Sequence, residues 1–86
     1  MLQAILKEST VNIIHQHFDE LSRKQLEICI LHTLGTPKKR IAESYSISVD
    51  AVKQNIQRSI QKLELENSDA LRTAILALTF TIMINK

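Results

Sequence analysis

One face of residues 49–62 carries side chains that can hydrogen-bond to nucleic acid, and they are Lys53, Gln54, Gln57, Arg58 and Gln61. Lysine, arginine and glutamine are side chains that contact base edges and phosphates in the major groove of DNA. Asp50 is the one acid of this stretch, whereas a helix that only faces solvent more often carries Glu and Lys in pairs. The residue types and their spacing therefore favour a helix face that contacts DNA.

The histidines and the cysteine give little support to catalysis or metal binding. His15 and His17 are two residues apart, and helical positions at that spacing point away from each other. His32 follows Cys29 by three residues, but two ligands do not make a zinc site. The sequence also has no glycine-rich phosphate loop and no nucleophile motif. We therefore expect no enzyme activity, no catalytic residue, no metal and no cofactor.

The positive charge of the chain is concentrated around the same stretch. The formal net charge is only +2, which alone points to no class of partner. Residues 36–62 hold six bases against two acids, while residues 1–35 and 63–86 each carry one more acid than bases. The six bases are Lys38, Lys39, Arg40, Lys53, Arg58 and Lys62. Such an excess is expected of a surface that meets phosphates, and a solvated charged face is the simpler alternative.

The composition predicts one small all-α domain. A chain of 86 residues, 44% of them hydrophobic, buries a single small core. One Gly and one Pro leave little material for hairpins, and few stretches alternate as strands do. We expect a small helical bundle containing a helix-turn-helix, with an added N-terminal helix and a long C-terminal helix. Its segments are an N-terminal helical segment (1–20), a helix-turn-helix DNA-binding core (21–67) and a C-terminal helix (68–86).

The lone cysteine and the apolar runs predict where the protein acts. Cys29 lies in an apolar helical stretch and has no second cysteine to pair with, so we expect a buried, reduced thiol. No basic region precedes the apolar residues at the N-terminus. The most apolar run, Ala74–Ile84, is about half of the roughly 20 residues that a membrane span needs. These features predict a cytoplasmic protein without membrane contact.

Helix start and stop signals divide the core into three helices. Ser22 and Gln25 have the spacing of a capping box, and Gly35 suits the left-handed conformation after a helix end. Thr36 is expected to cap the next helix, with Pro37 at its first helical position.

The turn before the third core helix is expected at Ser46–Ile47, with Ile47 in the core and Ser48 as the next cap. Lys38–Arg40 open the preceding helix, where cations oppose the helix dipole, so phosphate contact is the obvious reason for them. Val49 lies near the buried stripe by angle, so both a buried and an exposed position fit. The buried stripe of the third core helix is Val52, Ile56, Ile60 and Leu63.

The two ends of the chain are apolar and helical in pattern. Leu2–Phe18 has a broad apolar stripe that Ser9 and Thr10 interrupt, so one helix and two shorter helices both fit. Ser68-Asp69 is expected to cap the last helix. Its apolar residues include one stripe formed by Leu71, Ile75, Leu78 and Ile82. One stripe of that helix can seal the domain, and the rest needs another cover.

The remaining apolar and small faces of the last helix predict a partner that covers them. A helix that is apolar or small on most sides needs more cover than one side of a small domain gives. We therefore expect a homodimer, and an equally weighted alternative is that the Leu2–Phe18 helix covers the remaining surface. The predicted dimer residues are Ala70, Leu71, Ala74, Ala77, Leu78 and Thr81.

From Leu21 to Leu71 the chain resembles the LuxR-type (GerE-like) helix-turn-helix family. The family pattern L-[ST]-x-R-E is similar to Leu21–Gln25, and a Gly followed by N-K-E-I-A is similar to Gly35 and Lys38–Ala42. The pattern L-x-I-S-x-x-T-V-K-x-H is matched in part by Tyr45–Asn55, and a closing K-L by Lys62-Leu63. The chain departs from the family at Arg40 for Glu, Ala51 for Thr, Asn55 for His, Ser59 for Ile and Ser68 for Arg.

The resemblance implies that the helix after the turn enters the major groove and that dimers form through the last helix. By position, Lys53, Gln54 and Gln57 would read bases, and Lys39 and Lys62 would lie near phosphates. The full set of candidate DNA-binding residues is Lys38, Lys39, Arg40, Val49, Lys53, Gln54, Gln57, Arg58 and Lys62.

Two other functions fit parts of the pattern. The promoter-reading domain of a sigma factor has a similar motif ending in R-x-x-x-K-L, which Arg58 and Lys62-Leu63 match. A protein-interaction module that kept the fold and lost DNA binding is favoured by the family departures and the apolar termini. We expect double-stranded DNA and a second copy of the chain as partners, with RNA polymerase or another regulator as further candidates.

Overall fold

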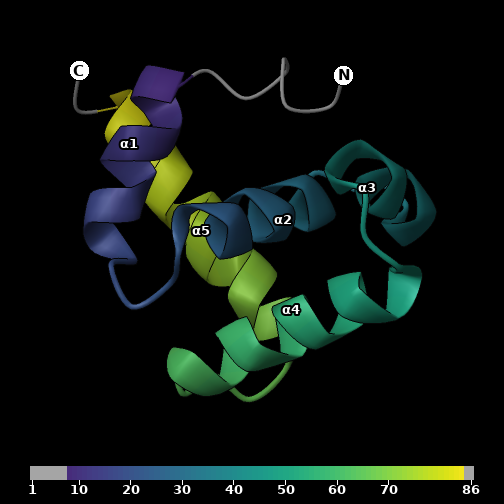
Figure 1. Cartoon of the computed structure of the whole chain (residues 1–86). Coiled ribbons are helices and arrows are strands. Elements are labelled where there is room, and N and C mark those ends of the chain that lie inside the picture. Colours follow the sequence, from purple (N-terminus) through teal and green to yellow (C-terminus); the bar gives the residue numbers. More distant parts are fainter. Residues whose placement is uncertain (1–7, 85–86) are drawn as a thin grey trace.

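The computed structural model describes residues 8–84, which form five α-helices and no strand (Figure 1). The helices are α1 (Glu8–His17), α2 (Arg23–Thr33), α3 (Lys38–Tyr45), α4 (Val49–Lys62) and α5 (Ser68–Ile84). The predicted all-α bundle with an added N-terminal helix and a long C-terminal helix is confirmed. Within the described part of the chain, no helix is long and apolar enough to cross a membrane.

Helix α2 lies at the centre of the molecule, where α3, α4, α5 and α1 all contact it (Figure 1). Its buried apolar residues point in every direction around the helix, and they are Leu26, Ile28, Cys29, Ile30 and Leu31. Full burial of one such aliphatic side chain stabilises a fold by about 1.5–3 kcal/mol, so α2 supplies a large share of the hydrophobic stabilisation. Cys29 is buried as predicted, and this burial raises the pKa of its thiol.

Each of the surrounding helices turns one apolar stripe toward α2. The residues that these stripes bury in the shared core are Ile41 and Ala42 of α3, Val52, Ile56 and Ile60 of α4, and Leu71 and Ile75 of α5. The edge of the core includes Leu63, Leu78 and Ile82, so the stripes predicted for α4 and α5 are confirmed. Leu71 is completely buried and Leu78 packs on the same core. Leu71 and Leu78 were predicted to contact a second chain, but that side of α5 faces the interior, so neither belongs to such a surface.

The predicted signals at both ends of α2 are present. Ser22 Oγ accepts the N–H of Gln25 at 3.1 Å, and Gln25 Oε1 accepts the N–H of Ser22 at 2.9 Å, which is a capping box. Gly35 has a left-handed φ of 90°. The N–H of Thr36 then donates to the carbonyl of Leu31 at 3.0 Å, which completes a Schellman closure.

The same closure ends α3 and α4, although neither uses glycine. Ser46 and Glu64 both have a φ of 56°. The residue after each donates back to the preceding helix at 3.0 Å, from Ile47 to the carbonyl of Ala42 and from Leu65 to the carbonyl of Ile60. Three successive helices therefore end by one mechanism, and each chain reversal is short.

Two predicted helix starts are wrong by one residue. Helix α3 begins at Lys38, because Pro37 has an extended backbone and Thr36 is already used to close α2. Helix α5 is capped by Asn67, whose Oδ1 accepts the N–H of Ala70 at 2.9 Å, so Ser68 is the first helical residue and not the cap.

Helix α1 covers part of the core. Val11 and Ile14 are buried in the same cluster as the inner stripe of α5, and Figure 1 draws α1 beside the C-terminal half of α5. Ser9 and Thr10 lie inside α1, and residues 1–7 of the predicted N-terminal segment lie outside the described residues. Helix α1 therefore supplies some of the cover that the inner side of α5 needs.

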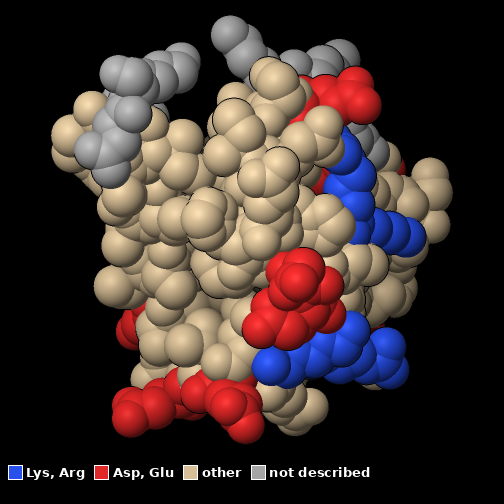
Figure 2. All heavy atoms as spheres, turned by 90° about the vertical axis from the view of Figure 1, so that its left-hand side faces the viewer, with Lys and Arg blue, Asp and Glu red and all other residues tan. Residues whose placement is uncertain are grey.

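The outer side of α5 keeps large apolar residues in contact with solvent. Leu76, Phe80 and Ile84 recur at helical spacing opposite the buried stripe, and the side chain of Phe80 is 65% exposed. Figure 2 looks onto the side of the molecule where α1 and the end of α5 lie, and shows a broad area without charged side chains. The charged side chains in that view lie on its right-hand side and in its lower half, where an acidic patch comes close to the centre.

Ser46→Gly should raise the free energy of unfolding by about 1 kcal/mol, because glycine adopts the left-handed conformation without the steric cost that Ser46 bears. Urea unfolding followed by circular dichroism measures the change. The matched control is Arg58→Gly, at an exposed position in the middle of α4. Glycine there should lower the same free energy by about 0.5–1 kcal/mol. A Ser46→Gly chain no more stable than the parent contradicts the proposed role of the turn.

Candidate nucleic-acid interface

A tight turn joins α3 to α4. Ser46 takes the left-handed conformation, and Ile47 packs on the core while its N–H donates to the last turn of α3. Ser48 Oγ then accepts the N–H of Ala51 at 3.0 Å and caps α4, as predicted. Since α4 packs on both α2 and α3, the turn and the core together define which side of α4 faces outward.

The outer face of α4 carries the polar side chains predicted to contact DNA. Val52, Ile56 and Ile60 are buried, so the opposite side of the helix is open to solvent. The side chain of Val49 is 37% exposed at the border of this face. The exposed polar residues of α4 in the predicted set, with one further glutamine, are Lys53, Gln54, Gln57, Arg58, Gln61 and Lys62. Such a face can donate hydrogen bonds to both base edges and phosphates.

The cations that open α3 divide into two environments. Lys39 and Arg40 are exposed, whereas Lys38 is half-buried. No acid lies in the first turn of α3 and no side chain caps it, so the positive end of the helix dipole adds to the charge of the lysines. The start of α3 is therefore electropositive for two independent reasons.

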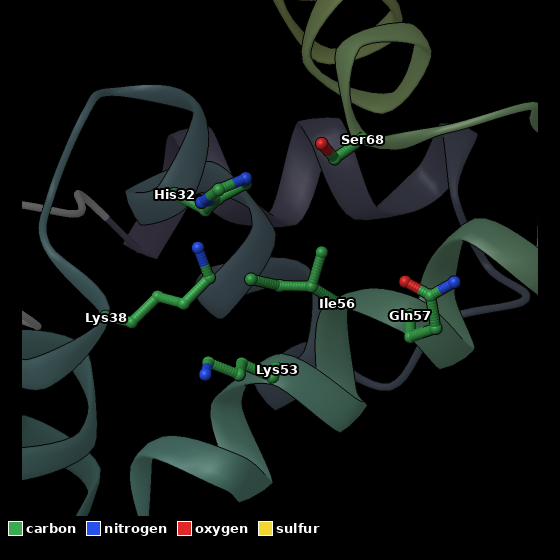
Figure 3. Close-up of a pocket in the computed structure, with 6 residues that line it drawn as sticks. All are labelled: His32, Lys38, Lys53, Ile56, Gln57 and Ser68. Carbon is green, nitrogen blue, oxygen red and sulfur yellow. The ribbon is translucent and has the colours of Figure 1, made fainter.

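Lys38 and Lys53 come together across an open pocket of about 340 Å³. In Figure 3 the Nζ of Lys38 points toward His32, and Lys53 lies along the α4 side of the same space. Ile56 lies between the two lysines, and Ser68 at the start of α5 borders the opposite side. The structure thus joins residues of α2, α3, α4 and α5 that are far apart in the sequence.

His32 and Ser68 line this pocket, although neither is among the residues predicted to bind DNA. Burial lowers the pKa of His32, and the charges of Lys38 and Arg72 lower it further. Within residues 8–84 no group of three His, Cys, Asp or Glu side chains could hold a metal ion. No local pattern marks these residues, because they meet only through the packing of their helices.

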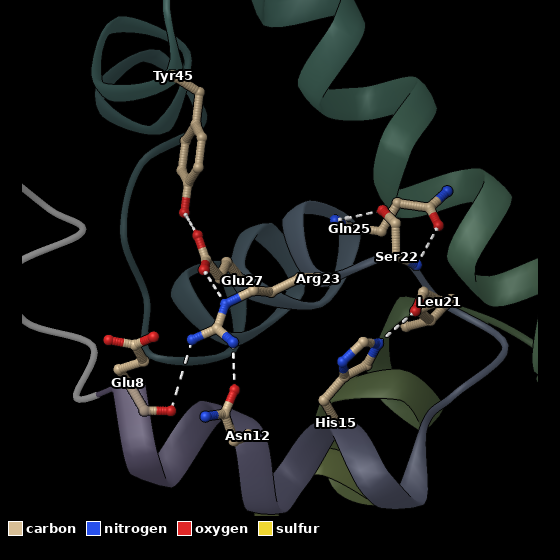
Figure 4. Close-up of polar contacts among 9 residues, drawn as sticks. All are labelled: Glu8, Asn12, His15, Leu21, Ser22, Arg23, Gln25, Glu27 and Tyr45. Carbon is tan, nitrogen blue, oxygen red and sulfur yellow. Dashed lines mark hydrogen bonds and ion pairs between the residues drawn. The ribbon is translucent and has the colours of Figure 1, made fainter.

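A polar network fixes the end of α3 against α2 and α1 (Figure 4). The hydroxyl of Tyr45 donates to Glu27 Oε1 at 2.7 Å, and Arg23 Nε donates to Glu27 Oε2 at 3.2 Å. Arg23 also donates to the Asn12 side chain on α1. Burial and the neighbouring Glu27 raise the pKa of Tyr45 well above its ordinary value, so the hydroxyl remains a donor. The residue just before the turn is therefore held in place.

Two of the positions that depart from the family lie toward the inside of α4. Ser59 is completely buried and donates to the carbonyl of Asn55 at 2.8 Å. Asn55 is half-buried, and its Oδ1 has no hydrogen-bond partner among residues 8–84. At the end of α4, Lys62 Nζ donates to Gln25 Oε1 at 3.2 Å and ties the helix to the start of α2.

No protein-family model, no curated protein and no solved structure matches this chain. The resemblance to the LuxR-type family that the sequence predicts therefore rests on the residues between Leu21 and Leu71 alone.

Proposed function

We propose that this chain is a bacterial transcription regulator that binds double-stranded DNA through a LuxR-type helix-turn-helix, with α4 in the major groove. The observation that carries the proposal is the outer face of α4, where lysine, glutamine and arginine side chains are exposed opposite a buried apolar stripe. The N-terminal part of such a helix reaches the base edges, which assigns base contacts to Lys53, Gln54 and Gln57. In a bacterium this function belongs to the cytoplasm.

Phosphate contacts are assigned to exposed cations on either side of the base-reading residues. Lys39 and Arg40 are exposed at the start of α3, and Arg58 and Lys62 are exposed on α4. Contacts of this kind position a protein on the duplex and make its affinity depend on salt. The local excess of bases over acids in residues 36–62 supports this assignment.

A homodimer through the outer side of α5 is part of the proposal. Leu76, Phe80 and Ile84 are exposed there, beside the predicted small residues. Of the predicted dimer residues, Ala77 and Thr81 are exposed and Ala70 and Ala74 are half-buried. Clusters of exposed apolar side chains mark partner surfaces, and a two-fold dimer would place two α4 helices about one DNA turn apart.

A protein-interaction module is the second candidate, and the same outer side of α5 favours it. An apolar helix face can dock on a different protein, such as RNA polymerase or another regulator, as readily as on a second copy. A domain similar to the promoter-reading domain of a sigma factor would make the same DNA contacts through α4 and would differ in its protein partner.

Gln54→Ala should weaken binding by about 1–3 kcal/mol and relax the preference for one base pair. The DNA consists of duplexes that the wild-type chain selects from a random pool, and fluorescence anisotropy measures the affinity. Gln16→Ala is the matched control, since Gln16 is an exposed glutamine on α1, outside the proposed interface. If Gln54→Ala keeps the wild-type preference at every base pair, the base-reading assignment is wrong.

Lys39→Ala should weaken binding to all duplexes alike and flatten the dependence of log affinity on log salt by about one unit, as expected when one phosphate contact is lost. Titrations at several salt concentrations provide the slope. Lys24→Ala removes an exposed lysine at the start of α2 and should leave the slope unchanged. Equal slopes for the Lys39 variant and the parent would remove Lys39 from the interface.

Phe80→Glu should convert a dimer into a folded monomer and weaken DNA binding, because a carboxylate in an apolar interface loses its hydration. Sedimentation equilibrium gives the mass, and circular dichroism checks folding. Leu34→Glu is the matched control, since Leu34 is 61% exposed at the end of α2 and lies outside α5. A wild-type chain that remains monomeric at high concentration contradicts the dimer.

A further inference from the structure

The pocket shared by four helices has the size and shape of a binding site for a small group. It is open to solvent on one side and measures about 340 Å³, against about 30 Å³ for one water molecule in the liquid. Its lining residues are His32 of α2, Lys38 of α3, Lys53, Ile56 and Gln57 of α4, and Ser68 of α5. Most of these side chains can donate a hydrogen bond, and none is a carboxylate.

The charged side chains that line the pocket are both cations. Lys38 and Lys53 line it from two helices, and within the described residues neither forms an ion pair. Arg72, one turn after Ser68 on α5, is close enough to His32 to affect its titration. The Nε of Arg72 is buried and has no acceptor in the described part of the chain. Cations that gather without a compensating acid repel one another, and an anion between them removes that repulsion.

The start of α5 adds neutral donors to this charge. Ser68 is the first residue of the helix and its side chain faces the pocket (Figure 3). The N-terminal N–H groups of a helix and its dipole favour a negative group, and phosphate is a common occupant of such positions. A tetrahedral oxyanion in the pocket would therefore meet ammonium groups from one side and a hydroxyl from the other.

We propose that this pocket binds a phosphate group, held between the ammonium groups of Lys38 and Lys53 and the hydroxyl of Ser68, with His32 against it. The phosphate comes either from a free phosphate or phosphate monoester or from the DNA backbone, and both present the same oxyanion. Of the residues assigned to base contacts, Lys53 and Gln57 line the pocket and Gln54 does not. The phosphate site therefore deepens the proposed function of α4 and rests in part on it.

The pKa of His32 should change when an anion occupies the pocket. The charged groups that face it are Lys38 of α3 and Arg72 of α5, which both hold its pKa down, and Lys53 of α4, which shares the pocket. A bound dianion opposes all three charges, so the pKa of His32 should rise on binding. By linkage, protonation of His32 favours binding as the pH falls, whereas protonation of the phosphate, whose second pKa is about 6 for a phosphate monoester, opposes it.

The test is an NMR titration of the whole chain with inorganic phosphate at constant ionic strength, with sodium chloride as the balancing salt. The imidazole resonances of His32 should shift and saturate, and its pKa should rise. His15, whose Nε2 bonds to the carbonyl of Leu21 at 2.7 Å on the α1 side, should not move. Lys38→Gln should weaken the binding about tenfold, as expected for one charge-assisted hydrogen bond, and Lys24→Gln should not weaken it. An unfolding curve checks that both variants fold.

The same titration with duplex DNA distinguishes the two sources of phosphate. A His32 shift with inorganic phosphate supports a free phosphate ligand, even for a chain that binds no DNA. A His32 shift with DNA alone, lost in Lys38→Gln, supports the DNA backbone as the source. If DNA binds and neither titrant moves His32, the pocket proposal is wrong while the DNA-binding proposal stands. A His32 shift that sodium chloride alone reproduces, or that Lys38→Gln leaves intact, also overturns the pocket proposal.

Discussion

Helix α2 buries apolar side chains on all sides between Leu26 and Leu31, and the positions of the other four helices follow from the need to cover them. Leu26, Ile28 and Leu31 point in different directions from the helix axis and all are buried. A helix of this length is not stable alone in water, so it forms only when α1, α3, α4 and α5 pack on it. Each covering helix has one apolar stripe, and burying that stripe decides which side faces solvent. The polar face of α4 is therefore exposed because Val52 and Ile56 are committed to α2.

The helices were predictable from the sequence because their apolar residues follow the helical period, but several helix ends were not. The capping box of Ser22 and the cap of Ser48 were predictable, because each side chain bonds to a backbone N–H only three residues along the chain. The left-handed residue that closes a helix is recognisable at Gly35, whereas Ser46 and Glu64 take the same conformation against their intrinsic preference. There the closure is imposed by Ile47 and Leu65, which pack on the core. Tertiary packing thus overrides local propensity at these two turns.

The candidate site was predictable only as far as it lies on one helix. The exposure of Gln54, Gln57 and Arg58 follows from the period of α4 and needs no knowledge of the fold. The pocket could not be predicted, because His32 and Ser68 meet Lys38 only when α2, α3 and α5 are in place. Helix α5 illustrates the same limit, since its period shows two apolar sides and only packing on α2 decides which one is internal.

Lys38–Arg40 lie in the first turn of α3, a position at which acidic side chains would stabilise the helix. Helices α4 and α5 carry Asp50 and Asp69 in their first turns, while α3 opens with cations that oppose its dipole. The nearby Nε of Arg72 is buried and finds no acceptor in the part of the chain that the structure describes, which is unfavourable as well. An oxyanion bound here would reverse the sign of each of these contributions. Because a ligand that binds only the folded state stabilises it, the same electrostatics that weaken the free chain would link its stability to the anion that it binds.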